Sequence, residues 1–281
     1  MKTILLQLDT DPQPSSFDRV VAVDAGVEEL FSYGGITPEN VESLVHGAMF
    51  TRGPSDLQNT AIFIGGSDVA AGEALFEKVQ SIFFGPMRVS VMMDSNGSNT
   101  TAAAAVLAAA KHLTLAETEA LVLGGTGPVG LRAAQLLAME GANVRLASRA
   151  RDRAAAACEQ ITSSVPTVKL TPCASDDAEA TAGAQLIIAA GAAGVQFLSA
   201  EQRTSIEGLK VAIDLNAVPP LGLEGIDVFD KAVEKEGQIC YGAIGVGGTK
   251  MKIHKAAIRR LFEANDQSLD TEAIYRLGQS L

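Results

Sequence analysis

The sequence predicts an α/β protein built from two domains, and three observations support that prediction. Short apolar runs alternate with longer helix-like runs along the chain, which is typical of parallel sheets covered by helices. The length of 281 residues fits one large or two medium domains, and 47% hydrophobic residues can fill a core in each. A glycine-rich segment at residues 124–130 separates a strand-like run from a helix-like run.

In the first hundred residues the alternation predicts a parallel α/β layer. Thr37 followed by Pro38 is a typical helix start, and Ser67 or Asp68 could cap a second helix. Strands are expected at 3–8, 60–64 and 88–93, and helices at 38–49, 69–83 and 100–112.

From residue 119 the pattern indicates a nucleotide-binding unit. A strand at 119–124 is followed by Gly125-Thr126-Gly127-Pro128-Val129-Gly130 and by a helix that Gly141 ends. In a G-x-G-x-x-G turn the glycines let the backbone approach a pyrophosphate, and the helix N-terminus offers free N–H groups. We therefore expect a Rossmann-type domain. Its expected cofactor contacts here are Gly125, Thr126, Gly127, Pro128 and Val129.

The remaining elements complete the predicted division of the chain. Strands are expected at 143–147, 167–170, 185–190, 210–215 and 239–243, and helices at 249–264 and 271–278. The expected parts are an N-terminal α/β substrate domain at 1–115, a Rossmann domain at 116–248 and C-terminal helices at 249–281.

The end of the second Rossmann strand bears on the choice of nucleotide. NAD-specific domains carry an acidic residue there, about 20 residues beyond the first glycine, which binds the ribose 2′-hydroxyl. Here Ser148 and Arg149 stand at that place, and Arg153 follows. A guanidinium pairs with a 2′-phosphate, so NADP is favoured. Asp152 could accept a hydrogen bond from the ribose of NAD, so NAD stays an alternative cofactor. Arg153 could instead be a solvated residue of the next helix.

A polar segment precedes the alanine-rich helix. Asp94-Ser95-Asn96-Gly97-Ser98-Asn99-Thr100-Thr101 follows a strand directly. Ser98 or Asn99 could serve only as a helix cap. Eight successive polar or glycine residues exceed what one cap needs, so a substrate site at the strand's carboxyl end is favoured.

A second glycine-rich segment, residues 242–248, leads toward Lys250 and His254, with Thr249 as the expected helix cap. Lys250 and His254 are four residues apart and share one helix face. His254 also lies near an apolar stripe, so it could be a packed core residue. Asp214 and Asn216 end another strand and could hold the ribose–nicotinamide region, or form a turn with its own internal bonds.

Composition excludes several classes of function. The net charge of −11 argues against nucleic-acid binding, because no basic field attracts phosphates. No apolar run approaches the roughly 20 residues of a membrane span, and residues 1–9 reach a carboxylate too soon for a secretion signal. The three cysteines show no metal-ligand spacing, so we expect no metal and a cytoplasmic location.

Together these segments resemble the NADP-dependent methylene-tetrahydromethanopterin dehydrogenases of methylotrophic bacteria, which are similar to the folate methylene dehydrogenase/cyclohydrolases but distinct from them. The specific part is Asp-Ser-Asn-Gly-Ser-Asn-Thr-Thr at 94–101 together with Gly-Gly-Thr-Lys-x-Lys-x-His at 247–254. The matching segments are 7–11, 60–66, 83–86, 94–101, 125–130, 216–222 and 242–254.

The resemblance implies NADP on the C-terminal domain, a pterin entering from the N-terminal domain and a cleft between them. It implies a homo-oligomer, a trimer or hexamer, acting in one-carbon metabolism. It implies catalytic roles for Thr101, Lys250 and His254, and pterin contacts for Asp18, Asp94, Asn99 and Thr100. It adds Asn216 and Gly245 to the cofactor contacts Ser148, Arg149 and Arg153, although Ser148-Arg149 departs from the family's expected Gly-Arg-Lys.

The implied reaction takes hydride from the one-carbon bridge of a methylene-pterin. No proton leaves the reacting carbon, so no general base is required. The sequence agrees, because it shows no Tyr-x-x-x-Lys pair and no clear histidine–aspartate pair. Lys250 and His254 would then orient the pterin.

Two alternatives remain open. A shikimate-type NADP dehydrogenase needs a lysine–aspartate pair, but neither Lys78 nor Lys111 precedes a suitable turn. A non-catalytic NADP sensor needs no second ligand site, so the polar segment at 94–101 argues against it.

Overall fold

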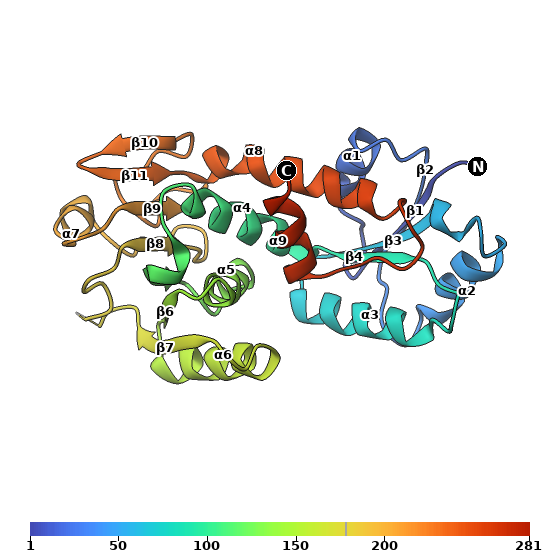
Figure 1. The fold of residues 1–281 in the computed structure, drawn as a ribbon, viewed down its shortest axis with the longest axis horizontal. Helices are drawn as coiled ribbons and strands as arrows, with labels where there is room; N and C mark the ends of the chain where they lie inside the picture. The colour runs from blue at the N-terminus through green and yellow to red at the C-terminus, as the bar shows by residue number, and fades with distance from the viewer. Residues whose placement is uncertain (178) are drawn as a thin grey trace. The chain divides into compact units, whose positions relative to one another are not determined.

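The computed structural model describes residues 1–177 and 179–281 (Figure 1). The chain forms two compact units. Unit 1 comprises residues 1–100 and 251–281, and unit 2 comprises residues 101–250. The expected domain bounds of 1–115, 116–248 and 249–281 stay a prediction.

Unit 1 contains a parallel sheet with the strand order β12-β4-β3-β1-β2. The register pairs Asp9 with Gly65 and Ile64 with Met93, so the carboxyl ends of β1, β3 and β4 meet at one edge. The strands are β1 (Ile4–Asp9), β2 (Glu29–Tyr33), β3 (Thr60–Gly65), β4 (Ser90–Met93) and β12 (Ser268–Leu269).

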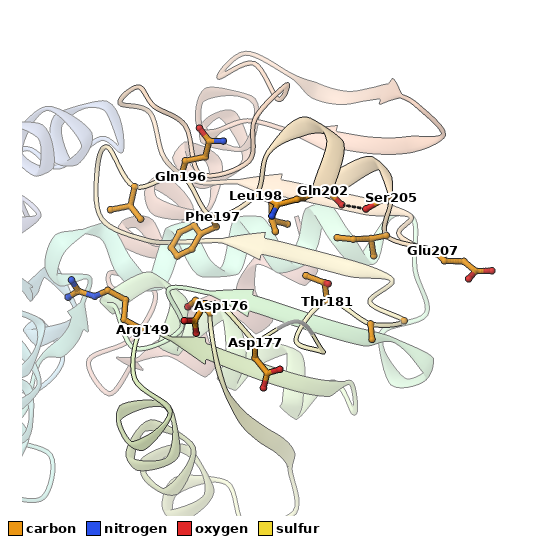
Figure 2. A pocket seen from close by; sticks show the side chains of 15 residues that line it. Arg149, Asp176, Asp177, Thr181, Gln196, Phe197, Leu198, Gln202, Ser205 and Glu207 are labelled. Atoms are coloured by element: carbon orange, nitrogen blue, oxygen red, sulfur yellow. Dashed lines mark hydrogen bonds between the residues drawn. The ribbon is translucent and has the colours of Figure 1, made fainter.

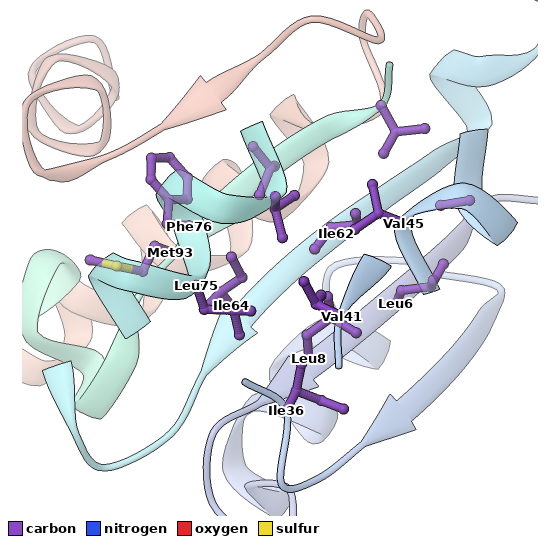
Figure 3. Packing of buried hydrophobic residues seen from close by; sticks show 14 of the residues in the cluster. Leu6, Leu8, Ile36, Val41, Val45, Ile62, Ile64, Leu75, Phe76 and Met93 are labelled. Atoms are coloured by element: carbon purple, nitrogen blue, oxygen red, sulfur yellow. The ribbon is translucent and has the colours of Figure 1, made fainter. Parts of the chain in front are cut away.

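The helices α2 and α3 pack on one face of this sheet (Figure 3). Leu8 and Ile64 of the sheet lie in one apolar cluster with Val45 of α2 and with Leu75 and Phe76 of α3. The helices that lie wholly in unit 1 are α1 (Ser16–Asp24), α2 (Glu42–Phe50), α3 (Val69–Ile82) and α9 (Thr271–Gln279).

The start of α2 differs from its prediction. Thr37 and Pro38 form a turn, in which the Thr37 N–H donates to Asn40 Oδ1 and Thr37 Oγ1 accepts from the Glu39 N–H, and the helix begins at Glu42. The polar side chains therefore close a turn of their own before the helix begins. The expected cap at Asp68 is confirmed, because its side chain accepts from the Ala71 N–H.

Unit 2 contains a sheet with the strand order β10-β11-β9-β8-β5-β6-β7. All neighbours pair in parallel except β10, which is antiparallel to β11. The chain runs outward from β5 on one side and from β8 on the other, which is the doubly wound order with its switch point between β5 and β8. The strands are β5 (Glu119–Leu123), β6 (Asn143–Ser148), β7 (Lys169–Ala174), β8 (Leu186–Ala189), β9 (Val211–Asp214), β10 (Lys231–Lys235) and β11 (Gln238–Tyr241).

The expected Rossmann-type α/β fold is therefore confirmed, with one clear error. The last long helix begins at Ala243, directly after β11, rather than at Thr249. The glycines at 245, 247 and 248 lie inside that helix, and Thr249 does not cap it. The further helices are α4 (Ser98–Ala110), α5 (Pro128–Met139), α6 (Arg151–Ser164), α7 (Ala200–Thr204) and α8 (Ala243–Arg260), with short 3₁₀ turns at Leu57–Asn59, Ser95–Gly97 and Leu115–Glu117.

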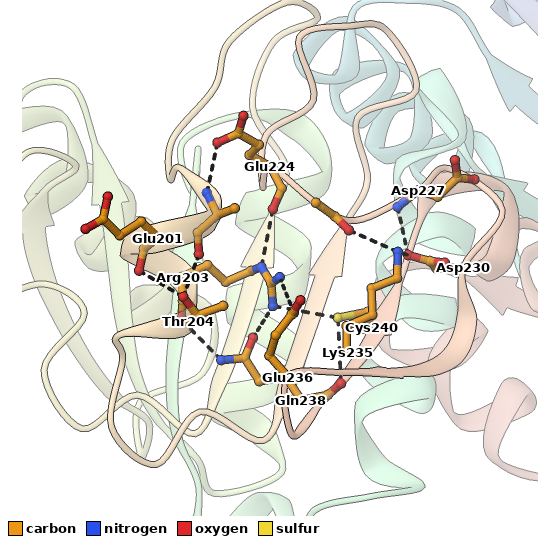
Figure 4. Close-up of polar contacts among 12 residues, drawn as sticks. Glu201, Arg203, Thr204, Glu224, Asp227, Asp230, Lys235, Glu236, Gln238 and Cys240 are labelled. Atoms are coloured by element: carbon orange, nitrogen blue, oxygen red, sulfur yellow. Dashed lines mark hydrogen bonds and ion pairs between the residues drawn. The ribbon is translucent and has the colours of Figure 1, made fainter.

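A buried arginine ties α7 to β11 (Figure 4). Arg203 donates hydrogen bonds to Gln238 Oε1, to Glu236 Oε2 at 3.0 Å and to the Glu224 carbonyl at 3.3 Å. The Gln238 side chain returns a bond to the Arg203 carbonyl at 3.1 Å. Since its partners satisfy the guanidinium, Arg203 is a structural element of unit 2.

Across residues 1–177 and 179–281, no helix has the length and apolar character needed to cross a lipid bilayer.

Candidate functional site

In unit 2, the turn between β5 and α5 has the geometry of a phosphate-binding loop. The Gly125 N–H donates to the Ala147 carbonyl at 2.9 Å, which fixes the turn to β6. Pro128 is the first residue of α5. Among the described residues, none accepts from the N–H groups of Val129 and Gly130, so the first turn of α5 can donate to an anion.

The three glycines of the G-x-G-x-x-G turn, which we call the fingerprint, differ in how tightly the protein packs around them. A Cβ at Gly125 would lie 2.6 Å from Leu146 Cγ, and one at Gly130 would lie 2.4 Å from the Gly124 carbonyl oxygen. The protein's own packing therefore requires these two glycines. A Cβ at Gly127 would lie 3.3 Å from the Gly124 carbonyl oxygen and 3.5 Å from the Ala190 carbonyl oxygen, a close contact that is milder than those at Gly125 and Gly130. A pyrophosphate bound beside the helix N-terminus would be a further reason for glycine at this position.

A cavity of about 790 Å³ is lined by Arg149 after β6, by Asp176 after β7 and by Phe197 after β8 (Figure 2). These are carboxyl ends of parallel strands, where nucleotides bind in open α/β sheets. Ser148 is buried, with its Oγ 3.3 Å from Thr126 Oγ1. Arg153 is exposed in the first turn of α6, as the alternative interpretation expected. The cavity also extends to Thr181 before β8 and to Glu207 before β9, and no residue of the glycine turn is among those that line it. The glycine turn and the residues after β6 have the features of a dinucleotide site.

At the end of β9, Asp214 and Asn216 bond to their own loop. Asp214 accepts from the N–H groups of Asn216 at 3.0 Å and Leu223 at 2.8 Å. The Asn216 side chain accepts from the Val218 N–H and donates to the Pro220 carbonyl. Burial raises the pKa of the Asp214 carboxyl group, and hydrogen bonds from backbone N–H groups, Leu223 first, oppose that rise. A cofactor contact by Asn216 stays a prediction.

The start of α8 is closed by the protein itself. The N–H groups of Ile244 and Gly245 donate to the Val228 carbonyl at 2.8 and 3.1 Å. A Cβ at Gly245 would lie 1.7 Å from the Asp230 carbonyl oxygen, so packing alone requires this glycine. The role of Gly245 toward a cofactor stays a prediction, and its backbone N–H is already used.

In unit 1, the polar segment after β4 is organised by Asp94. One carboxylate oxygen accepts from the N–H groups of Asn99 at 2.9 Å and Thr100 at 3.0 Å, and the other accepts from Thr100 Oγ1 at 2.6 Å. Asp94 therefore accepts from the first N–H groups of α4, the capping role that the alternative interpretation gave to Ser98 or Asn99. Asn99 donates from Nδ2 to the Met93 carbonyl and accepts from Thr271 Oγ1.

His254 comes from α8 to this same place. Its Nδ1 lies 3.8 Å from Asp94 Oδ2, and both side chains are fully buried. Its ring stacks on Phe63, with centroids 5.6 Å apart and planes at 20°. The sequence shows no clear histidine–aspartate pair, and this approach arises because folding brings together residues that are far apart in the sequence. Lys250, one helical turn earlier, is half-buried.

Asp18 is held near the end of β3 by a relay of hydrogen bonds. Asp9, at the end of β1, accepts from the N–H groups of Asp11 and Ser15, and Ser15 Oγ accepts from the Asp18 N–H. A Cβ at Gly65 would lie 3.2 Å from Asp9 Oδ2 and 3.5 Å from Asp18 Oδ2. Two carboxylates therefore converge at this glycine, with Asp9 fully buried and Asp18 half-buried.

The sequence interpretation assigned no site role to Asp9, Phe17, Phe63 or Gly65. Phe17 is 49% exposed, and its ring lies 6.3 Å from that of His254. A carboxylate ending a buried strand, as Asp9 does, was the available signal. In the described part of the chain, no three His, Cys, Asp or Glu side chains are grouped to hold a metal ion.

Comparison with known proteins identifies the family. Residues 16–96 match the model of the N-terminal part of methylene-tetrahydromethanopterin dehydrogenase. The chain is 45% identical over 285 residues to the bifunctional protein MdtA of Methylorubrum extorquens, covering 100% of this chain and 99% of that protein. It is 32% identical over 296 residues to the NAD(P)-dependent methylenetetrahydromethanopterin dehydrogenase of the same organism, covering 99% and 98%.

Solved structures agree on the fold alone. Quinate dehydrogenase from Corynebacterium glutamicum in complex with NAD is 14% identical, with a TM-score of 0.52 and coverage of 100% of this chain and 99% of that one. Shikimate dehydrogenase from Aquifex aeolicus is 13% identical, with a TM-score of 0.52 and coverage of 98% and 97%. With two relatives matched over almost their entire lengths, the chain belongs to the methylene-tetrahydromethanopterin dehydrogenase family.

Proposed function

We propose that this protein is an NADP-dependent dehydrogenase that oxidises methylene-tetrahydromethanopterin to the methenyl form in one-carbon metabolism, at the stage of formaldehyde oxidation. The observation that carries the proposal is the 32% identity, over 99% of the chain, to a dehydrogenase named for that substrate. NAD is the second cofactor, since that relative is named as NAD(P)-dependent.

The reaction requires the protein to orient the two reactants and does not require acid–base catalysis. The carbon that reacts lies between two nitrogens, which stabilise the methenyl cation after hydride is lost. No proton leaves that carbon, so no residue needs to act as its base. When bound, the oxidised nicotinamide ring supplies the acceptor. The chain's own residues bind the two partners, orient them and exclude water.

The residues of unit 2 are suited to hold the cofactor. The N–H groups of Val129 and Gly130 donate to the pyrophosphate, and Gly127, without a side chain, lets it approach the backbone. Arg149 pairs with the 2′-phosphate from the edge of the cavity. Ser148, beside Thr126, supports that edge. Contacts from Arg153, Asn216 and Gly245 also belong to the proposal.

The residues of unit 1 are suited to hold the pterin. Asp18, with Asp9 beside it, accepts from the N–H groups of the pterin ring. Asp94 fixes the turn that carries Asn99 and Thr100, and Thr101 follows directly. Catalytic roles for Thr101 and Lys250, which belong to unit 2, stay a prediction.

The buried His254 acts indirectly in the proposal, through Asp94. Because its side chain is fully buried, 3.8 Å from Asp94 and stacked on Phe63, we assign it a positioning role. The structure thus favours orientation over proton transfer for this histidine.

A cytoplasmic location and a homo-oligomeric state, a trimer or hexamer, are further parts of the proposal. The thiols of Cys158, Cys173 and Cys240 support the first part, because they are buried and free of disulfide bonds in the described chain. Burial raises the pKa of each thiol, to about 11 for Cys158, so these residues are not reactive centres. Size-exclusion chromatography with light scattering tests the second part.

Initial rates test the proposed activity. Purified protein is mixed with NADP and either methylene-tetrahydromethanopterin, methylene-tetrahydrofolate or shikimate, and the absorbance band of NADPH is followed. The proposal expects turnover with methylene-tetrahydromethanopterin and none with shikimate. The ratio of the rates with methylene-tetrahydromethanopterin and methylene-tetrahydrofolate measures which one-carbon carrier the enzyme prefers. Tight NADPH binding without turnover of either pterin would overturn the dehydrogenase assignment and favour a sensor.

A further inference from the structure

The cavity of unit 2 that Arg149 borders is also lined by Asp176. β6 and β7 run in parallel, with Ser148 paired to Ala174. The Ser175 N–H then donates to the Ser148 carbonyl at 2.8 Å. Asp176 is the next residue, and it lines the same cavity as Arg149. A carboxylate from β7 therefore stands beside the end of β6, where the sequence itself places none.

The other acidic residues near this edge are less suited to a ligand. Asp152 lies on the exposed first turn of α6 and is not among the residues that line the cavity. Asp177 lines the cavity but accepts a hydrogen bond from the Glu179 N–H at 3.1 Å. In Figure 2 the Asp177 side chain points away from Arg149, whereas Asp176 lies on the side of the cavity that Arg149 borders.

NAD and NADP differ at the 2′ position of the adenosine ribose, and the two forms of that position bind side chains of opposite charge. The ribose 2′-hydroxyl of NAD donates a hydrogen bond to a carboxylate, as in domains with an acid after the second strand. The 2′-phosphate of NADP carries about two negative charges, pairs with a guanidinium and is repelled by a carboxylate. Arg149 and Asp176 bring a guanidinium and a carboxylate to one cavity, which Asp177 and Glu207 also line.

We propose that Asp176 determines the choice between NADP and NAD, in opposition to Arg149. Asp176 accepts from the adenosine ribose of NAD and weakens the binding of NADP. Arg149 pairs with the 2′-phosphate and strengthens the binding of NADP. This assignment rests on the proposed cofactor site. It adds Asp176 to that site as the carboxylate that is absent at the end of β6.

Three variants separate the roles. Asp176→Asn removes the charge but keeps the shape, and we expect the ratio of the NADH and NADPH dissociation constants to move about tenfold toward NADPH, the effect of one charge-assisted contact. Asp176→Ser, a second variant at this exposed position, moves it in the same direction. Arg149→Met weakens NADPH by about tenfold and changes NADH little. Asp177→Asn is the matched control and keeps the original ratio.

The measurement is a fluorescence titration of each full-length protein with NADH and with NADPH, without any pterin. Thermal unfolding of every variant verifies its fold. A ratio that stays constant in Asp176→Asn and Asp176→Ser, or that moves equally in Asp177→Asn, would overturn the role of Asp176 and leave the dehydrogenase assignment intact. If the unaltered protein binds neither nucleotide, both proposals are overturned.

Discussion

Two glycine-rich segments of this chain look alike in sequence and do opposite things in the structure. After β5, the glycines at 124–127 make a turn, and α5 begins only at Pro128. After β11, α8 begins at once, and the glycines at 245–248 lie in its first turns. The first helix leaves N–H groups open for a ligand, as far as the described residues show, whereas the second donates them to the Val228 carbonyl.

The neighbours of each absent Cβ explain the difference. Gly245 lies against the Asp230 backbone, so its lack of a side chain lets a loop cover the start of α8. A Cβ at Gly127 would be crowded only mildly, at 3.3 Å from the Gly124 carbonyl oxygen, so packing is a weaker reason for this glycine than for Gly245. A glycine-rich segment is thus evidence for a ligand only when the protein's own packing does not already require the glycines.

The largest effect should come from filling the space at the start of α8. Gly245→Ala puts a methyl group 1.7 Å from the Asp230 carbonyl oxygen, so the loop or the helix must move. We expect a loss of about 3 kcal/mol or more in the free energy of unfolding, at the upper end of overpacking effects. Chemical denaturation with linear extrapolation measures it.

Gly247→Ala is the matched control on the same helix. Beyond its chain neighbours and its own helix backbone, no atom of the described residues lies within 4 Å of its Cβ position, so the substitution adds only helix propensity. We expect a gain of roughly 0.5–1 kcal/mol in the free energy of unfolding. Equal destabilisation by Gly245→Ala and Gly247→Ala would contradict the packing explanation of the difference between the two segments.

The contrast also shows which features could be read from the sequence. The strand, turn and helix around 119–141 depend on local signals, namely an apolar run, Pro128 at the first helical position and Gly141 with a φ of +88°. The start of α8 depends on a loop, residues 227–230, that covers it. Local turn signals therefore predicted a helix start at Thr249, which was wrong.

The candidate site in unit 1 also combines features that the local sequence shows with features that depend on the tertiary fold. The polar segment after β4 could be found because it is local. The approach of His254 to Asp94, and of Asp9 and Asp18 to Gly65, depends on the register of parallel strands and on the return of the chain to unit 1. The helix α1 was also missed, because Val20 and Val23 are exposed on it and blur the apolar pattern.

A smaller effect, on binding rather than on folding, is expected at the fingerprint. Gly127→Ala places a methyl group where the backbone would approach a pyrophosphate, with its nearest protein neighbour at 3.3 Å. We expect NADPH affinity to fall about 30-fold, or about 2 kcal/mol, while the free energy of unfolding changes by less than about 1 kcal/mol. Fluorescence titration and denaturation measure the two quantities.

Gly130→Ala is the comparison within the same turn. Its Cβ would lie 2.4 Å from the Gly124 carbonyl oxygen, so the loss should appear in the free energy of unfolding. If Gly127→Ala bound NADPH as well as the unaltered protein, the fingerprint would share the purely structural role of the second segment.

The smallest effect is expected at Lys250, which follows the glycines of the second segment. It tests whether that segment contributes to function. Lys250→Ala should raise the KM for the methylene-pterin about tenfold and slow turnover, since one charge-assisted contact is lost. NADPH affinity should stay within about twofold, because the proposed pyrophosphate site is at the first segment and not at this one. Lys252→Ala, exposed on the same helix two residues away, should change neither quantity. A loss of NADPH affinity in Lys250→Ala equal to the change in KM would instead assign this helix to the cofactor, and the distinction between the two segments would fail.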